Sequence, residues 1–407
     1  MRKAILHIDG DGFFASCEIS LNPALRGKPV VTGQERGIAT AMSPEAKKLG
    51  VSRGMPIFQV KKNFPQVVVV NSNYHSYGIF AQRMYDIVRR YTDQVEEYSI
   101  DECFALLHDS EGATDLVAVA REIKETLQKE LGMTFSLGLA PTKVLAKVAS
   151  KWNKPDGFTV ITHADIEAFL KDMLVSKVWG IGPAQSQHLY SIGIKTALEL
   201  IQKPLEWINA TQHKHIRELW HELGGQEVYK VHHERDDDQA SIQKTRTFTP
   251  PTQDKEKLFS ELAYNVEAAC QKARHARLVP SRVYYFLKTQ EFRYHRHEIV
   301  LTIPTTSPHA ILNAIKDTFD TIYREGVDYR ATGVTLSDLR PVEVSQNDLF
   351  GEVVENQKWI EIYKIADLID RRYGSRTIRL ASSQRAYKRR GARPTRLLKI
   401  PYMGEVL

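Results

Sequence analysis

The sequence predicts a multidomain α+β protein, and three observations lead to this fold class. Strand-like apolar runs and helical patterns do not strictly alternate over residues 1–162, which disfavours a doubly wound parallel sheet. Residues 165–230 carry helical patterns only. After a polar linker at 233–241, residues 242–340 show the order strand, helix, strand, strand, helix, strand. A chain of 407 residues is also too long for one hydrophobic core.

The hydrophobic pattern places the individual elements. In the amino-terminal part, strands are expected at 1–9, 29–31, 67–70, 95–107 and 134–139, and helices at 76–91, 114–131 and 141–153. The last helix carries Lys143, Lys147 and Lys151 at four-residue spacing, and such a stripe predicts a solvated basic face. Farther on, strands are expected at 242–248, 280–289, 296–303 and 330–338, and helices at 255–275, 308–325 and 357–372.

Composition narrows the class of protein. No apolar run is long enough to cross a membrane, and no signal-peptide pattern opens the chain, so we expect a cytoplasmic protein without membrane contact. The three scattered cysteines predict neither a disulfide framework nor a zinc site. Residues 351–407 hold 13 Lys/Arg and 6 Asp/Glu, whereas the first 350 residues have no net charge. This basic tail predicts attraction to nucleic acid, with a solvated tail as the alternative.

Two apolar runs end in acidic residues. Residues 6–8 lead into Asp9, and residues 98–100 lead into Asp101 and Glu102. Buried carboxylates need a counter-charge, and no Lys or Arg lies beside them in the sequence. A hard divalent cation such as Mg²⁺ is the natural partner, and a site with two such ions would catalyse in-line phosphoryl or nucleotidyl transfer.

Two alternatives exist for the first acidic cluster. Asp9, Asp11, Gly12, Phe14 and Glu18 also fall on positions of an EF-hand calcium loop. That loop would begin at His7, a poor calcium ligand, and too few residues precede it for the incoming helix. The other alternative is that Asp9 and Asp11 cap a helix starting near Phe13. It leaves the second acidic pair unexplained.

A glycine-rich turn lies in the helical region. Val178-Trp179-Gly180-Ile181-Gly182-Pro183 has the pattern of the hairpin in a helix-hairpin-helix. Gly180 and Gly182 would let the backbone approach a phosphate, and the following helix would offer N–H groups. The turn therefore predicts binding to a DNA backbone.

These segments together resemble a known family. Asp-x-Asp-x-Phe-Phe-Ala at 9–15, Ser-Ile-Asp-Glu at 99–102 and Lys-Pro-Asp-Gly at 154–157 resemble the Y-family translesion DNA polymerases, and most closely the bacterial DNA polymerase IV branch. The resemblance implies a right-hand polymerase. Its parts would be the palm (1–10 and 75–162), the fingers (11–74), the helical thumb with its helix-hairpin-helix (163–232) and, after the linker, a separate α+β little finger (242–342).

The resemblance also implies roles for individual residues. Asp9, Asp101 and Glu102 match the catalytic, metal-binding acids, and the backbone carbonyl of Gly10 would be a further metal ligand. Asp11 matches an acid that is less directly catalytic. The other matches are nucleotide-binding: Phe14 as the aromatic that excludes a ribose 2′-hydroxyl, Phe13 beside it, and Lys154 as a triphosphate ligand.

The fingers depart from the family pattern. The family has Tyr-x-x-Arg for the triphosphate, where this chain has Pro44-Glu45-Ala46-Lys47. Lys47 keeps the charge but loses the bidentate guanidinium, which puts the strength of nucleotide binding in doubt. Ser43 as N-cap, Pro44 at the first helical position and Gly50 after the end predict a short helix here.

Residues 343–350 contain Gln346-Asn347-Asp348-Leu349-Phe350, which resembles the peptide that docks bacterial polymerases on the sliding clamp. Gln346, Leu349 and Phe350 would be its anchors. The tail at 351–407 exceeds the usual polymerase IV pattern, and the resemblance assigns it no role.

Together these features predict template-directed, low-fidelity translesion DNA synthesis by a monomer. The substrates would be primer–template DNA and deoxynucleoside triphosphates, with two Mg²⁺ ions per active site and the sliding clamp as partner. A non-catalytic DNA-binding scaffold of the same fold is the alternative, favoured only by the changes at Pro44 and Lys47. A nucleotide cyclase would leave the hairpin and the clamp-like peptide unexplained.

Overall fold

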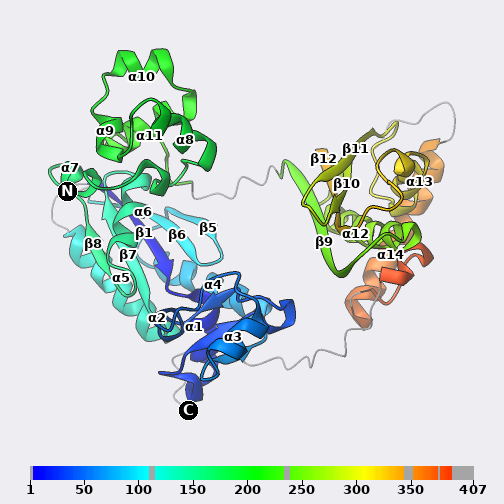
Figure 1. The fold of residues 1–407 in the computed structure, drawn as a ribbon, viewed down its shortest axis with the longest axis horizontal. Coiled ribbons are helices and arrows are strands. Elements are labelled where there is room, and N and C mark those ends of the chain that lie inside the picture. The colour runs from blue at the N-terminus through cyan, green and yellow to red at the C-terminus, as the bar shows by residue number, and fades with distance from the viewer. Residues whose placement is uncertain (1–2, 110–114, 233–238, 343–351, 375, 387–407) are drawn as a thin grey trace. The chain divides into compact units, whose positions relative to one another are not determined.

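The computed structural model describes residues 3–109, 115–232, 239–342, 352–374 and 376–386. They form two compact units, one up to residue 232 and one from residue 239 onward (Figure 1). The predicted clamp-binding peptide and most of the polar linker lie outside the described residues.

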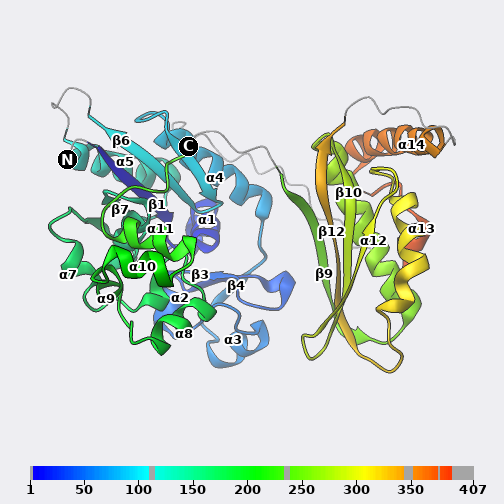
Figure 2. The same ribbon diagram turned by 90° about the horizontal axis from the view of Figure 1, so that it is seen from above.

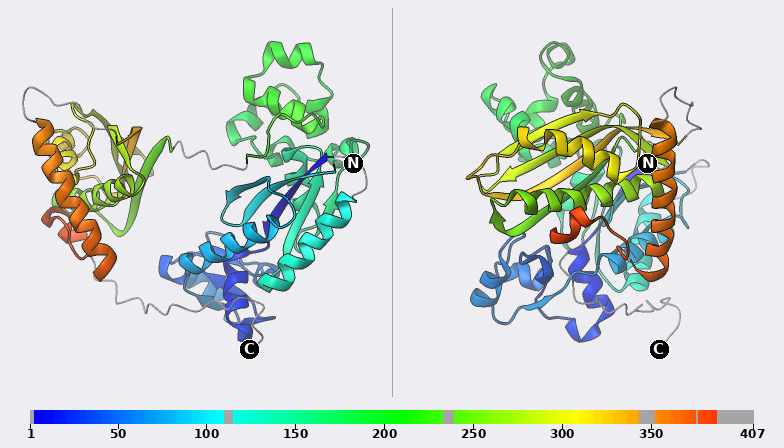
Figure 3. Two further views of the ribbon diagram at one scale, coloured as in Figure 1. Left: turned by 180° about the vertical axis from the view of Figure 1, so that it is seen from behind. Right: turned by 90° about the vertical axis from the view of Figure 1, so that its right-hand side faces the viewer.

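The first unit is built on a five-stranded sheet. Its strands lie in the order β5 (Val95–Ser99), β6 (Glu102–His108), β1 (Lys3–Gly10), β7 (Phe135–Ala140) and β8 (Phe158–Val160). Helices α4 (Tyr74–Val88) and α5 (Leu116–Leu131) cover one face, and α6 (Lys143–Trp152) covers the other (Figure 3, left). The predicted elements are present here, with ends shifted by a few residues.

Strand β1 is buried on both faces, and its alternation decides where its polar residues point. Leu6 and Ile8 pack in the core shared with α4 and α5, whereas Ile5 packs in the core shared with α6. Because successive side chains alternate between the faces of a strand, His7 and Asp9 lie on the α6 side. Both are buried.

Helix α6 approaches the sheet closely at Gly138 in β7. A Cβ atom at this position would lie 2.2 Å from the carbonyl oxygen of Ala146 and 2.3 Å from the backbone nitrogen of Ser150. Only glycine permits this approach. The helix is therefore held tightly over the face that carries Asp9.

Between β1 and α4 the first unit has a small sheet in the order β3 (Ala41–Met42), β2 (Val30–Thr32) and β4 (Val68–Val70). Around it lie α1 (Phe13–Leu21), η1 (Pro23–Leu25), η2 (Gln34–Arg36), α2 (Pro44–Lys48) and α3 (Ile57–Asn63). The predicted short helix is confirmed as α2. The Ser43 side chain accepts a hydrogen bond from the Ala46 N–H, Pro44 occupies the first turn, and Gly50 has φ +99°.

The predicted all-helical region contains α7 (Ile166–Leu170), η3 (Val175–Lys177), α8 (Pro183–Ser191), α9 (Ala197–Ile201), α10 (Leu205–Thr211) and α11 (Lys214–Leu223). These helices share a core with α6. A fully buried carboxylate, Glu222, fixes this junction. It accepts hydrogen bonds from the backbone N–H groups of Val228 and Tyr229, both at 2.7 Å, and from Val144 at the start of α6, at 3.2 Å.

The second unit confirms the predicted order of elements in residues 242–340. These are β9 (Ser241–Thr252), α12 (Lys255–His275), β10 (Leu278–Thr289), β11 (Tyr294–Val300), α13 (Pro308–Thr318), η4 (Phe319–Thr321) and β12 (Tyr329–Pro341). The antiparallel sheet has the order β11-β10-β12-β9, and the helices lie on one side of it (Figure 2).

The helix expected near 357–372 is also present, as α14 (Glu352–Tyr373). It lies on the helical side of the second unit, where Asp367 receives two hydrogen bonds from the Arg274 guanidinium at 2.7 and 2.9 Å. The 3₁₀ helix η5 (Ala381–Ala386) packs against α12, and the Ala386 carbonyl accepts a hydrogen bond from Arg246. The first part of the basic tail is thus packed on the α+β unit. Within the described residues, no helix has the length and apolar character needed to span a membrane.

Candidate active site

The acids predicted to act together meet at one end of the five-stranded sheet. Asp9 at the end of β1 lies directly opposite Glu102 at the start of β6. Asp101 precedes Glu102, and its backbone carbonyl accepts a hydrogen bond from the Gly10 N–H at 2.9 Å. Because β1 ends just after Asp9 and the antiparallel strand β6 begins at Glu102, their pairing brings the two acidic segments together. The second acidic pair does not end a strand as predicted, since Asp101 lies in the turn between β5 and β6.

Asp9 has an unusual charge environment. It is 5% exposed, and the Lys154 Nζ lies 2.5 Å from its Oδ1. Burial, together with the neighbouring Glu102 carboxylate, raises the pKa of Asp9 to about 7 although Lys154 acts in the opposite direction. A second positive charge at this position would stabilise the ionised form.

Glu102 also has a lysine partner. Lys147 on α6 donates a hydrogen bond from Nζ to Glu102 Oε2 at 2.8 Å. One turn earlier, the Lys143 Nζ lies 2.6 Å from Glu96. Both lysines are buried, so the prediction of a solvated stripe is wrong for them. Because α6 packs closely on the sheet at Gly138, its side with Lys143 and Lys147 faces the acids.

Asp101 is oriented locally, because its Oδ1 accepts a hydrogen bond from the Ser99 hydroxyl at 2.7 Å. In the part of the chain that the structure describes, no three His, Cys, Asp or Glu side chains are arranged as a metal site. Lysines from distant segments balance Asp9 and Glu102 instead. The donor set still fits a hard divalent cation: three carboxylates lie at one sheet end, and the buried Asp9 has a raised pKa.

Asp11 has a different part in the structure. Its carboxylate accepts hydrogen bonds from the Ser136 hydroxyl and from the backbone N–H of Asp156, both at 2.8 Å. It therefore anchors the turn at 154–157 that carries Lys154. Helix α1 has Gly12 as N-cap without a side-chain hydrogen bond, so the capping alternative is wrong. The EF-hand alternative is also wrong, since residues 7–10 belong to β1.

The two predicted aromatic residues differ in exposure. Phe13 is 3% exposed and packs in the core, against Gly10. Phe14 is half-buried and stacks on Tyr77, with ring centroids 4.6 Å apart and an interplanar angle of 12°. Tyr77 is held in turn by a hydrogen bond from its hydroxyl to Glu18 at 2.7 Å. Of the pair, Phe14 is the one that a ligand can reach.

Lys47 lies exposed on the last turn of α2, and the structure gives it no ion pair. Within the described residues, it is therefore a cation free to meet an anionic ligand. Its position in α2 follows from the Ser43 cap.

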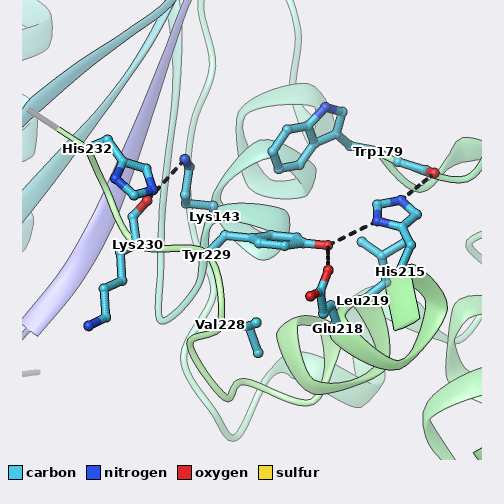
Figure 4. A pocket seen from close by; sticks show the side chains of 10 residues that line it. Lys143, Trp179, His215, Glu218, Leu219, Val228, Tyr229, Lys230 and His232 are labelled. Atoms are coloured by element: carbon cyan, nitrogen blue, oxygen red, sulfur yellow. Dashed lines mark hydrogen bonds between the residues drawn. The ribbon is translucent and has the colours of Figure 1, made fainter. Parts of the chain in front are cut away.

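The predicted hairpin is held by α11 and by the chain that follows it. Gly180 has φ +97°, and its carbonyl oxygen lies 2.9 Å from His215 Nε2. The other ring nitrogen of His215 lies 3.2 Å from the Tyr229 hydroxyl, which also donates to Glu218 (Figure 4). Gly182 is the N-cap of α8, and its N–H donates to the Gln185 side chain.

A cavity of about 520 Å³ lies beside this hairpin. Figure 4 shows Trp179, Tyr229 and Lys143 around it, together with the hydrogen bond from Lys143 to the Lys230 carbonyl at 3.4 Å. Sequence patterns gave no sign of this lining, because its residues come from segments far apart in the chain.

Comparison with known proteins identifies the family. Residues 8–151 match the model of the impB/mucB/samB family, and residues 239–349 match the C-terminal domain of that family. The DNA polymerase IV of Listeria innocua serovar 6a is 32% identical over 349 residues, which are 84% of this chain and 96% of that protein. The chain belongs to the DNA polymerase IV branch of the Y-family polymerases. It is a DNA-directed DNA polymerase of translesion synthesis, and the scaffold alternative is not favoured.

Another relative is similar to this Y-family polymerase over a larger part of the chain. DNA polymerase IV 1 of Bacillus subtilis (strain 168) is 30% identical over 392 residues, covering 93% of this chain and 92% of that protein. Residues 1–350 alone make up less than 93% of the chain, so the similarity to this relative continues into the tail at 351–407.

The solved structures support the right-hand fold alone, because their identity is low. A Y-family chimera of Dbh and Dpo4 has a TM-score of 0.70 at 23% identity, covering 83% of this chain and 99% of that one. An insertion ternary complex of Dbh DNA polymerase has a TM-score of 0.52 at the same identity and coverage.

Proposed function

We propose that the end of the five-stranded sheet is the polymerase active site, with Asp9, Asp101 and Glu102 as metal-binding acids and the Gly10 carbonyl as a further ligand. The observation that carries the proposal is the cross-strand pairing of Asp9 with Glu102, next to Asp101. Dependence on divalent metal is general to the family, and we propose two Mg²⁺ ions. When bound, they would lower the pKa of the primer 3′-hydroxyl and hold the triphosphate.

Side chains around the acids would bind the incoming deoxynucleoside triphosphate. Lys154 is bonded to Asp9 from an anchored turn, and its side chain is 32% exposed, so it can exchange this carboxylate for a phosphate. Lys47 would supply a second, weaker contact. Phe14, fixed by its stacking on Tyr77, would exclude a ribose 2′-hydroxyl, while Phe13 supports it from the core.

The other predicted sites follow the same proposal. Gly180 and Gly182 would let the hairpin contact the backbone of the primer–template duplex. Gln346, Leu349 and Phe350 would anchor a monomeric, cytoplasmic polymerase to the sliding clamp.

Changing these three clamp residues together to Ala should remove clamp-stimulated synthesis and leave unstimulated extension unchanged. Equal stimulation of the variant would refute this assignment.

The active-site proposal is tested by primer extension on templates that differ at one base. We expect Mg²⁺-dependent insertion of the complementary nucleotide, and no insertion by Glu102→Gln at equal primer–template affinity in a gel-shift assay. The change keeps the size of the side chain and removes its charge. Parental insertion by this variant would show that Glu102 is not a metal-binding acid.

A further inference from the structure

Lys147 is enclosed to an unusual degree for a lysine. Its side chain is 6% exposed, and its ammonium donates to Glu102 Oε2 at 2.8 Å. The same nitrogen lies 4.3 Å from the ring centroid of Tyr98 and 5.1 Å from that of Trp179. A buried ammonium is stable only with such compensation, here one carboxylate and two aromatic rings.

The two rings come from different parts of the first unit. Tyr98 lies on β5, next to the strand that begins with Glu102, and Trp179 directly precedes the hairpin glycine Gly180. The indole N–H of Trp179 donates to the Tyr98 hydroxyl at 3.0 Å, and the rings meet edge to face with centroids 5.5 Å apart. The sheet and the thumb therefore each supply one aromatic ring around Lys147.

We propose that Lys147 is a positioning residue for Glu102. By keeping Oε2 engaged, the enclosed ammonium leaves Oε1 to face Asp9 and an ion held there. Lys147 does not contact substrate, and it acts through the carboxylate alone. This inference rests on the proposed metal-binding role of Glu102 and adds a fixed partner to it. Trp179, beside the hairpin at Gly180, thereby also helps to hold Glu102 in position.

The same helix provides a matched control. The Lys143 side chain is 5% exposed, its ammonium lies 2.6 Å from both oxygens of Glu96, and it sits 4.7 Å from the Phe104 ring centroid. Glu96 is 18% exposed and Glu102 is 16% exposed, so the two ion pairs are alike in burial. Glu96, however, binds the backbone N–H of His232 and is not one of the three acids.

The test compares Lys147→Met with Lys143→Met. Each is measured for melting temperature, primer–template affinity, steady-state insertion, and Mn²⁺ affinity by electron paramagnetic resonance with a dideoxy-terminated primer. We expect similar losses of melting temperature, since both variants break an equivalent ion pair. Only Lys147→Met should lower kcat, at least tenfold, with KM for the nucleotide and DNA affinity within twofold of the parent.

Mn²⁺ affinity supplies a readout that is independent of activity. Lys147→Met leaves the Glu102 carboxylate without its fixed partner, so we expect at least threefold weaker Mn²⁺ binding together with the slower insertion, and no change in Lys143→Met. Equal kcat and Mn²⁺ affinity in the two variants would overturn the inference. If Glu102→Gln also inserted nucleotides normally, the proposed active site itself would fail; if Glu102→Gln were inactive, only the role of Lys147 would fail.

A second variant covers the case in which Lys147→Met does not fold. Tyr98→Leu keeps both charges and removes one ring. We expect it to lower kcat about threefold without weakening DNA binding, because the ammonium is then held less firmly. A parental kcat in Tyr98→Leu would overturn the inference as well.

Discussion

Two lysines form ion pairs with acids of the same site, and the two lysine side chains differ in how firmly the protein holds them. Lys147 is buried under aromatic rings against Glu102, whereas Lys154 pairs with Asp9 from a turn and is 32% exposed. Removing one partner of a buried ion pair such as Lys147–Glu102 costs about 3–5 kcal/mol. In the Lys154 pair only the carboxylate is buried, so water and other anions can reach the ammonium. Lys147 is thus a permanent part of the site. We therefore expect Lys154 to be an exchangeable counter-ion that transfers to the triphosphate.

Among the residues proposed to contact the nucleotide, the largest effect is expected from Lys154. Lys154→Ala should lower kcat/KM for the incoming nucleotide by about 10- to 100-fold, because a charge-assisted hydrogen bond is worth about 1.5–3 kcal/mol. Primer–template affinity should stay within twofold. Lys151→Ala, an exposed lysine on the neighbouring helix α6, is the control and should change kcat/KM far less. Equal losses in both variants would mean that Lys154 acts through general electrostatics and not through a contact with the triphosphate.

A second prediction concerns a contact fixed by packing. Phe14→Ala should lower the discrimination against ribonucleotides at least tenfold and leave deoxynucleotide insertion within about threefold of the parent. The reason is that the ring, held rigidly by stacking on Tyr77, would exclude a ribose 2′-hydroxyl, which a deoxynucleotide lacks. Single-nucleotide insertion of both sugars measures this. If discrimination is unchanged, the ring of Phe14 does not contact the sugar.

The smallest effect is expected at an exposed contact of the fingers. Lys47→Arg should lower KM for the nucleotide by about two- to fivefold, because a guanidinium binds phosphate bidentately. Lys48→Arg on the same helix is the matched control and should leave KM unchanged. A KM that does not respond to Lys47→Arg would place Lys47 away from the triphosphate.

Much of the fold was predictable because it depends on local patterns. The apolar run before Asp9 predicted strand β1, whereas the run before Asp101 was expected to end in its acids and instead leads into a turn, after which Glu102 begins β6. In the fingers, Ser43, Pro44 and Gly50 predicted helix α2. The order of elements in residues 242–340 was also predictable, since each element is long and strongly periodic.

The counter-charges of the acids were not predictable in the same way. Spacing alone cannot distinguish a solvated lysine stripe from one that faces a sheet, and the burial of Lys143 and Lys147 depends on the approach of α6 at Gly138. Glu222 was missed for the same reason, because its partners lie in other elements. Such contacts are set by tertiary packing, which leaves little trace in a local pattern.

We propose that the end of the five-stranded sheet holds the metal ions of nucleotidyl transfer. Asp101→Asn tests it most directly, because Asp101 has no lysine partner in the described structure. Its carboxylate accepts a hydroxyl hydrogen bond from Ser99, which an amide oxygen can also accept. In a single-turnover insertion assay at saturating Mg²⁺ and nucleotide, we predict a rate at least a thousandfold below the parent (about 4 kcal/mol), with primer–template affinity within twofold. A rate within tenfold of the parent would contradict the account.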